Sequence, residues 1–200
     1  MKPALTVSLA AVAAVVVTAN LVYWVFPDYL PGGPDTESPY GTLGGDFQLD
    51  SADGPVALSD FEGQAVMLFF GFTHCPDYCL ASLAVKRQVL ADLPDHLEGR
   101  VKGLFVSVDP DRDDVQTLAE YTEFFHEDII GVTGSKEDID RITGLYGAAY
   151  YFEELPDSDL EYTVEHTTRT YLIGPQGTVM DLFSYNTPYT EMLERINEIL

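Results

Sequence analysis

The centre of the chain alternates apolar runs with apolar residues at helical spacing, and the first such pair is the clearest. Residues 66–70 form an uninterrupted apolar run with β-branched and aromatic members, which predicts a buried strand. From Pro76 the apolar residues recur at helical spacing instead, until Pro94 stops the pattern. These helical positions are Leu80, Leu83, Leu90 and Leu93. We therefore expect a strand that leads directly into a helix.

The same order repeats further along the chain. Residues 103–108 form a second apolar run, which predicts another buried strand, and the residues after it mark one face of a helix. That face consists of Val115, Leu118, Thr122 and Phe125. Ser135 and Asp138 make a capping-box pattern before a third helix, which Gly147 can close. This part of the chain is therefore predicted to run strand, helix, strand, helix, helix.

The hydrophobic period changes again towards the C-terminus. Residues 170–173 and 178–183 have the composition of short strands, and the Gly-Pro-Gln-Gly sequence at 174–177 suits a tight hairpin turn. Thr187-Pro188 then begins a last helix, with proline where its missing N–H costs least. A βαβα half followed by a β-hairpin and a helix is the thioredoxin-like order. We therefore predict an α/β fold with a central mixed sheet flanked by helices.

The N-terminal region has a different character. Residues 4–26 carry no charged side chain and would extend about 34 Å as a helix, against a hydrocarbon core of about 30 Å. Lys2 precedes this run and aromatic residues follow it, which predicts an uncleaved transmembrane helix whose N-terminus is cytoplasmic. A signal peptide cleaved after Val17-Thr18-Ala19 is the alternative, but the apolar stretch continues beyond that point.

Three segments follow from this interpretation. Residues 1–27 are a cytoplasmic tip and a transmembrane anchor, and residues 28–45 are a flexible tether rich in proline and glycine. Residues 46–200 are the folded domain. No cysteine follows the apolar run to accept a lipid. We expect a single-pass protein of a bacterial inner membrane, with its C-terminal domain in the periplasm.

The net charge narrows the range of partners. The chain has 33 acidic residues against 10 basic ones, a formal charge of −23 over 200 residues. Such a surface repels phosphate backbones and anionic lipid headgroups, so we expect no nucleic-acid partner. A hydrophobic content of 46% is enough to fill a core, which excludes a wholly disordered chain.

The candidate chemistry lies where the first predicted strand gives way to its helix. Cys75 and Cys79 are the two cysteines of the chain, too few for a disulfide scaffold but suited to redox or metal chemistry. A helix N-terminus favours thiolate, the form that binds metals and attacks disulfides. Residues four apart share a helix face, so both sulfurs can point at one ion. A structural disulfide is the alternative, one that an oxidising compartment allows.

A third metal ligand has to come from another part of the chain, because two thiolates do not complete a transition-metal site. His166 is the candidate, in the segment 165–168 before the late hairpin, since that loop lies against the start of the cysteine helix in a thioredoxin-like sheet. Two sulfurs and a neutral imidazole would select Cu(I) and can also hold Cu(II). A hydrogen-bonded structural histidine also explains this residue, so both interpretations stay open here.

Other polar residues near these motifs have structural explanations. His74 is expected to point away from the Cys75 side chain if the segment is extended, so we assign it a structural role. Asp77 either tunes the thiolates, receives a partner's positive charge or simply favours the helix dipole. The acidic run of Asp109, Asp111 and Asp113 lacks the glycine that a calcium loop requires, so we interpret it as helix capping.

Three motifs in this order closely resemble the Sco/SenC family. The first is residues 69–79, Phe-Phe-Gly-Phe-Thr-His-Cys-Pro-Asp-Tyr-Cys, and the second is residues 106–113, Val-Ser-Val-Asp-Pro-Asp-Arg-Asp. The third is Glu165-His166 ahead of Tyr171-Leu172. The resemblance covers residues 45–200, and it implies a thioredoxin-like, membrane-anchored copper protein that helps to metallate the Cu(A) centre of cytochrome c oxidase.

The resemblance also assigns site residues. It implies that Cys75, Cys79 and His166 are the three copper ligands, and that Asp77 is the acidic residue that the family has between its cysteines. The chain departs from the family after the second cysteine, where Leu80 stands in place of the common proline. This departure affects how the helix begins, and not which residues bind the metal.

Three functions remain open at this stage, and the third, a redox or copper sensor that signals through a bound partner, leaves no clear mark in the sequence. The first is a copper metallochaperone, not an enzyme, which delivers its ion to the copper-bearing oxidase subunit by ligand exchange, and whose loading requires both thiols reduced. The second is a thiol-disulfide reductase that keeps the cysteines of the oxidase copper site reduced, which needs the dithiol but no histidine ligand. Other expected partners are further copper chaperones or thiol reductants, and the inner membrane through the N-terminal helix.

Overall fold

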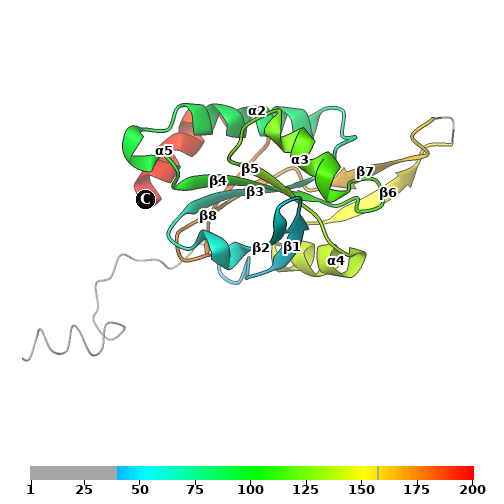
Figure 1. The fold of residues 1–200 in the computed structure, drawn as a ribbon, viewed down its shortest axis with the longest axis horizontal. Helices are drawn as coiled ribbons and strands as arrows, with labels where there is room; N and C mark the ends of the chain where they lie inside the picture. The colour runs from blue at the N-terminus through cyan, green and yellow to red at the C-terminus, as the bar shows by residue number, and fades with distance from the viewer. Residues whose placement is uncertain (1–39, 157) are drawn as a thin grey trace, which may run out of the picture. The chain divides into compact units, whose positions relative to one another are not determined.

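The computed structural model describes residues 40–156 and 158–200 (Figure 1). The anchor expected at 1–27 and most of the tether expected at 28–45 lie outside these ranges. Within the described ranges, no helix is long and apolar enough to cross a membrane.

A five-stranded mixed sheet forms the centre of the domain. Its strand order is β5-β4-β3-β8-β9. The strands are β3 (Ala65–Gly71), β4 (Val101–Ser107), β5 (Ile129–Val132), β8 (Thr170–Ile173) and β9 (Val179–Phe183). The first three are parallel, whereas β8 pairs antiparallel with β3 and β9 antiparallel with β8. Every residue of the central strand β3 is buried, because both faces of the sheet are covered, and this explains its continuous apolar sequence.

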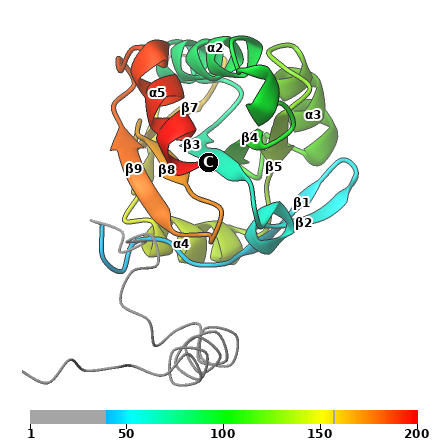
Figure 2. The ribbon, with the colours of Figure 1, turned by 90° about the vertical axis from the view of Figure 1, so that its left-hand side faces the viewer.

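The described residues form four α-helices, which lie around the sheet (Figure 2). They are α2 (Tyr78–Ala91), α3 (Val115–Glu123), α4 (Lys136–Leu145) and α5 (Tyr189–Ile199). Helices α2 and α5 cover one face of the sheet and α4 covers the other, while α3 packs beside β5 (Figures 1 and 2). The predicted cap of α4 is confirmed, since the Ser135 hydroxyl accepts a hydrogen bond from the Asp138 N–H at 3.2 Å. Gly147 follows the helix with a φ of +59°, the left-handed conformation that glycine adopts without strain.

The expected α/β order is confirmed, with three additions. The strand β5 and two hairpins were not predicted from the sequence: β1 (Gln48–Ser51) with β2 (Gly54–Ala57), and β6 (Tyr150–Glu154) with β7 (Tyr162–His166). Two short 3-10 turns, η2 (Leu58–Phe61) and η3 (Asp95–Leu97), complete the described elements. The β6–β7 hairpin projects from the body of the domain (Figure 1), and most of its residues are exposed or half-buried, so it carries no strong apolar pattern.

Two of the four predicted positions are not on the buried face of α2: Leu80 is exposed, and Leu93 lies beyond the last helical residue, Ala91. Leu80 is 44% exposed, so its assignment to the apolar face was wrong. The helix begins at Tyr78, and its buried face runs instead through Cys79, Leu83, Lys86 and Leu90. The inward face of α2 thus contains both Cys79 and a lysine, Lys86.

Residues 40–45, which the sequence assigns to the tether, are attached to the folded unit. The Tyr40 hydroxyl donates a hydrogen bond to Asp181 Oδ1 at 2.8 Å, and the Gly44 N–H donates to the Leu145 carbonyl at 2.8 Å. Leu43 packs against the hydrophobic core.

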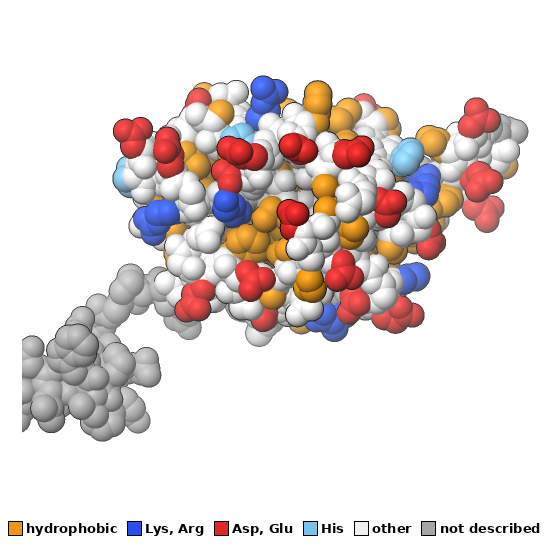
Figure 3. All heavy atoms as spheres, viewed as in Figure 1, with side chains coloured by type: hydrophobic (Ala, Val, Ile, Leu, Met, Phe, Trp, Pro, Cys, Tyr) orange, Lys and Arg blue, Asp and Glu red, His pale blue; other side chains and the backbone are white. Residues whose placement is uncertain are grey.

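Acidic side chains are spread over the face of the domain shown in Figure 3, and are not gathered in one tail.

Candidate metal centre

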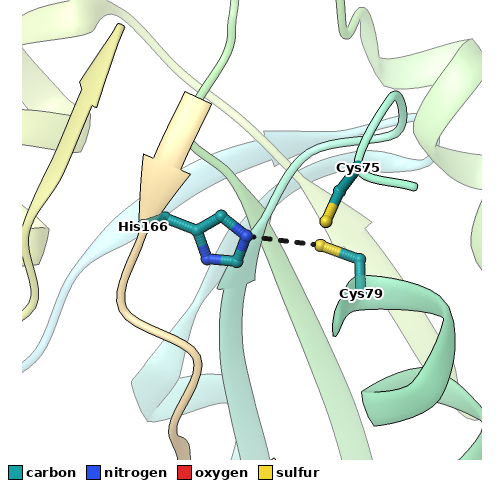
Figure 4. A group of neighbouring side chains, drawn as sticks. All are labelled: Cys75, Cys79 and His166. Carbon is teal, nitrogen blue, oxygen red and sulfur yellow. Dashed lines mark hydrogen bonds between the residues drawn. The ribbon is translucent and has the colours of Figure 1, made fainter. Parts of the chain in front are cut away.

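Three side chains from two distant segments meet at the edge of the central sheet (Figure 4). Cys75 lies in the loop between β3 and α2, Cys79 lies in the first turn of α2, and His166 is the last residue of β7. Their ligand atoms, two sulfurs and one ring nitrogen, all lie within 4.8 Å of one another. Neither cysteine forms a disulfide, and both are buried. The structure therefore brings together the three predicted site residues.

Two details of the predicted geometry were wrong. Cys75 precedes the helix, so the sulfurs do not meet by sharing a helix face. A turn brings them together instead, in which the Cys75 N–H donates a hydrogen bond to the Phe72 carbonyl at 3.2 Å. His166 also lies at the end of a strand and not in a loop. Its position is therefore fixed by the β6–β7 pairing, in which Tyr150 faces His166.

Hydrogen bonding and packing orient the imidazole of His166. Its Nδ1 lies 3.1 Å from the Thr167 carbonyl, which can only accept a hydrogen bond, so Nδ1 carries the proton. The unprotonated Nε2 then faces Cys79 Sγ at 3.6 Å (Figure 4). The rings of Phe69 and Phe72 stand edge to face with the imidazole, at centroid distances of 5.9 and 5.8 Å. The nitrogen that can bind a metal is thus held facing the sulfurs.

The two sulfurs have opposite proton affinities. A hydrogen bond from Cys79 lowers the pKa of Cys75 to about 4 despite partial burial. Burial raises the pKa of Cys79, and the neighbouring Cys75 raises it further. At neutral pH the pair therefore consists of a Cys75 thiolate and a Cys79 thiol. A metal that binds both sulfurs has to displace the Cys79 proton.

Gly71, the last residue of β3, allows the close approach of Cys79 to the sheet. A Cβ atom at this position would lie 2.6 Å from Cys79 Sγ and 2.7 Å from the nearest ring carbon of Phe105. Both distances are far below ordinary van der Waals contact, at about 3.5–4.0 Å between carbon atoms. Gly71 was not predicted as a site residue, because glycine is required here by a helix that packs against the strand.

Asp113 holds the loop that carries the cysteines. This fully buried carboxylate accepts hydrogen bonds from the Thr73 N–H at 2.9 Å, the Thr73 hydroxyl at 2.5 Å and the Ser107 hydroxyl at 2.6 Å. The interpretation of the 109–113 run as helix capping was wrong, because Asp114 caps α3 by accepting from the Thr117 N–H at 2.7 Å.

The same run also holds β7, which carries the histidine. Arg112 donates one hydrogen bond to Asp109 Oδ2 at 2.5 Å and another to the Tyr162 carbonyl at 3.0 Å. The Tyr162 hydroxyl donates to Asp109 Oδ1 at 2.9 Å, and the guanidinium of Arg112 stacks over the Tyr162 ring at 3.8 Å. Residues 109–113 therefore connect both segments that supply the candidate ligands.

The remaining predicted residues lie outside the cluster. Asp77 is the exposed N-cap residue of α2, and its side chain makes no capping hydrogen bond. His74 is exposed, and its Nδ1 lies 3.1 Å from the Thr73 hydroxyl. Neither side chain belongs to the Cys-Cys-His group.

The fold and the site define a thioredoxin-like domain with a Cys-Cys-His centre suited to a soft metal ion. The family model described as SCO1/SenC matches residues 35–200, and the chain belongs to this family. Among curated proteins, the mitochondrial SCO1 homolog of Mus musculus is 38% identical over 152 residues, which cover 75% of this chain and 53% of the relative. The chain thus spans about half the length of the curated relatives it matches.

Solved structures agree with this assignment. The copper-bound crystal structure of Arabidopsis thaliana ScoI is 34% identical, with a TM-score of 0.72, and the match covers 78% of this chain and 98% of that one. The solution structure of apo Sco1 from Thermus thermophilus is 31% identical, with a TM-score of 0.74 over 82% of this chain and 95% of that one.

Proposed function

We propose that this chain is a membrane-anchored copper metallochaperone that delivers copper to the Cu(A) site of cytochrome c oxidase. Cys75, Cys79 and His166 are its copper ligands. The observation that carries this proposal is the convergence of two sulfurs and one oriented imidazole nitrogen within 4.8 Å. Such a ligand set suits Cu(I) and can also hold Cu(II). The copper in the related Arabidopsis thaliana ScoI supports the choice of metal.

The protonation states of the two cysteines suit the binding of a metal ion that is later passed on. The Cys75 thiolate is available at neutral pH to meet the incoming ion, and the Cys79 proton leaves as its sulfur binds. His166 already directs its Nε2 at Cys79 Sγ, so this ligand needs no reorientation. Three protein ligands leave room for an incoming ligand from the acceptor, which allows transfer by ligand exchange.

Copper binding by matched histidine variants tests the proposal. Reduced wild-type protein is expected to bind one Cu(I), measured by competition with a chromogenic Cu(I) chelator, with sulfur and nitrogen ligands in X-ray absorption. His166→Ala is expected to weaken binding by more than about 100-fold, beyond the 10–100-fold typical for a residue that only supports a ligand. His74→Ala, which removes an exposed neighbouring imidazole, is expected to bind like the wild type. Equal affinities for all three proteins would remove His166 from the site.

One observation favours a second function, a thiol-disulfide reductase that keeps the oxidase copper-site cysteines reduced. The Cys75 thiolate, with a pKa of about 4, lies beside the free thiol of Cys79, an arrangement suited to dithiol exchange. Rescue of oxidase activity in a deletion strain separates the two functions. A reductase tolerates His166→Ala but not Cys79→Ser, whereas a metallochaperone tolerates neither.

The location of the domain is part of the proposal. Residues 1–27 are proposed to anchor the chain once in a bacterial inner membrane, with residues 28–45 as tether and residues 46–200 in the periplasm. The copper-bearing oxidase subunit, other copper chaperones and thiol reductants are then the accessible partners, and nucleic acids are not. Protease digestion of spheroplasts tests the topology, since a periplasmic domain is degraded without membrane lysis and a cytoplasmic domain is protected.

A further inference from the structure

Lys86 is a buried cation beneath the candidate metal centre. It lies on α2 seven residues after Cys79, so both residues are on the same face of the helix, and it is 1% exposed. Its Nζ donates a hydrogen bond to the Thr170 hydroxyl at 2.7 Å and lies 4.5 Å from the ring centroid of Phe69. Phe69 is also one of the two rings that hold the imidazole of His166. The lysine thus contacts the layer that supports the site.

Packing alone does not account for a lysine at this position. No carboxylate pairs with Lys86 among the residues that the structure describes. An unpaired buried charge is costly, and a hydrophobic side chain of similar volume, such as methionine, is often tolerated equally well or better. Burial lowers the pKa of Lys86 to about 7, and a negative charge on the Cys79 sulfur, which only its thiolate form carries, acts in the opposite direction. The thiolate form of Cys79, which is the form that binds a metal, therefore supplies a negative charge that acts on this lysine.

Other charged groups near the centre do not take this role. The guanidinium of Arg112 is already paired with the buried Asp109. The phenol of Tyr121 stays protonated, because burial and the negative charge of the sulfurs raise its pKa. Lys86 is thus a buried cation on α2 that has no carboxylate partner in the described part of the chain.

We propose that Lys86 offsets the charge of the copper dithiolate and so favours bound Cu(I) over bound Cu(II). The inference rests on the proposed function. A Cu(I) ion with two thiolates and a neutral imidazole has a net charge of −1, whereas the same ligands around Cu(II) are neutral. Reduction of the bound ion by an external one-electron donor adds that negative charge, and the ammonium of Lys86 stabilises it. Lys86 is therefore a positioning residue, which acts through the ligands and does not bind the metal.

The expected size of the effect follows from the helix geometry. Seven residues of helix rise about 10 Å, and side chains lean towards the helix N-terminus, which brings the ammonium closer to Cys79. A unit charge at about 10 Å in a medium with an effective dielectric constant of about 20 changes a binding constant by about tenfold. For a one-electron couple, tenfold corresponds to about 59 mV.

Lys86→Met tests the proposal in the full domain. Cu(I) and Cu(II) affinities are measured by chelator competition, and the potential of the bound copper by spectroscopic redox titration. The variant is expected to lose about tenfold in Cu(I) affinity relative to Cu(II), and its copper potential is expected to fall by about 59 mV. Lys136→Met removes an exposed charge, and Thr170→Val removes the hydrogen bond of Lys86 but keeps its charge. Both controls are expected to stay within about twofold of the wild type, since neither removes a buried charge.

Different results would refute the proposed function and the role of Lys86. If the wild-type protein binds no copper through sulfur and nitrogen, the proposed function fails. If it binds copper and the Cu(I)-to-Cu(II) ratio of Lys86→Met matches that of Lys136→Met, the role of Lys86 is overturned. A loss in Thr170→Val as large as that in Lys86→Met would assign the effect to packing and overturn it too. Lys86→Gln provides a second uncharged variant, and failure of both variants to fold would make Lys86 a structural residue only.

Discussion

The contact between Gly71 and Cys79 makes a strong prediction, because a single methyl group is enough to disturb it. In Gly71→Ala the new Cβ would meet Cys79 Sγ at 2.6 Å and a Phe105 ring carbon at 2.7 Å. Ordinary contacts are about 3.5–4.0 Å, so the sulfur or the strand has to move by about 1 Å. Cys79 and Phe105 are both fully buried, so neither side chain can move into solvent.

Gly71→Ala is expected to lower both the stability of the domain and its affinity for copper. Inserting a methyl group into a well-packed core costs about 1–3 kcal/mol. For a domain of this size, about 2 kcal/mol lowers the Tm by about 4–8 °C. A displacement of about 1 Å exceeds the tolerance of about 0.2 Å for metal–ligand distances. We therefore expect Gly71→Ala to weaken Cu(I) binding by about 10–100-fold, as for other disturbances to the support of a ligand.

Gly144→Ala is the matched control for Gly71→Ala. Gly144 lies on the exposed side of α4, and a Cβ at this position would have nothing within 4 Å. Alanine in a helix is more favourable than glycine by about 0.5–1 kcal/mol, so this variant is expected to gain stability and to bind copper normally. Thermal unfolding of the reduced apo proteins and competition for Cu(I) measure both effects. If Gly71→Ala matched the wild type in both Tm and copper affinity, the close approach of the sulfur to β3 would be unimportant.

Two further predictions concern the loop and the thiols. Asp113→Asn leaves at least one of the Thr73 or Ser107 donors without its acceptor, so we expect a loss of about 1–3 kcal/mol in the free energy of unfolding by urea. The exposed Asp111→Asn should change it by less than about 0.5 kcal/mol, and equal effects would contradict the role of Asp113. Iodoacetamide reacts with thiolate, so alkylation of Cys75 in the reduced apo protein should rise with pH to about 4–5 and stay level from pH 6 to 8. A tenfold rise per pH unit over that range would show an ordinary thiol.

Local patterns were sufficient to predict most of the central fold. The run at 66–70 is apolar because β3 is buried on both faces, and the turn at 174–177 joins two strands as predicted, the second of which begins one residue later than expected. The strand β5 was missed, since its four residues include a glycine, a residue that is depleted in strands. The β6–β7 hairpin was missed because its exposed residues do not alternate clearly between apolar and polar. Hydrophobic patterns thus identify helices and strands that bury one face or are buried completely.

Some residues of the candidate site could be predicted from local sequence, and others could not. The cysteine pair and its place before a helix are local features, and they were visible in the sequence. Lys86 left a weaker signal, a charged residue in phase with Cys79 and Leu83 on an apolar helix face, which was not recognised. Gly71 and Asp113 left no signal of this kind, because each is required by a contact with a residue distant in the chain.

Local sequence is enough to predict the strand-to-helix junction that presents two thiols, since hydrophobic period and turn residues act over a few neighbouring positions. The approach of His166 to Cys79, 87 residues away in the chain, at 3.6 Å could not be predicted from local sequence and depends on the folded domain. That distance depends on the pairing of β6 with β7 and on the contacts of residues 109–113 with both segments. Long-range packing also decided which carboxylate and which lysine are buried, because burial depends on what covers a residue as well as on its own chemistry.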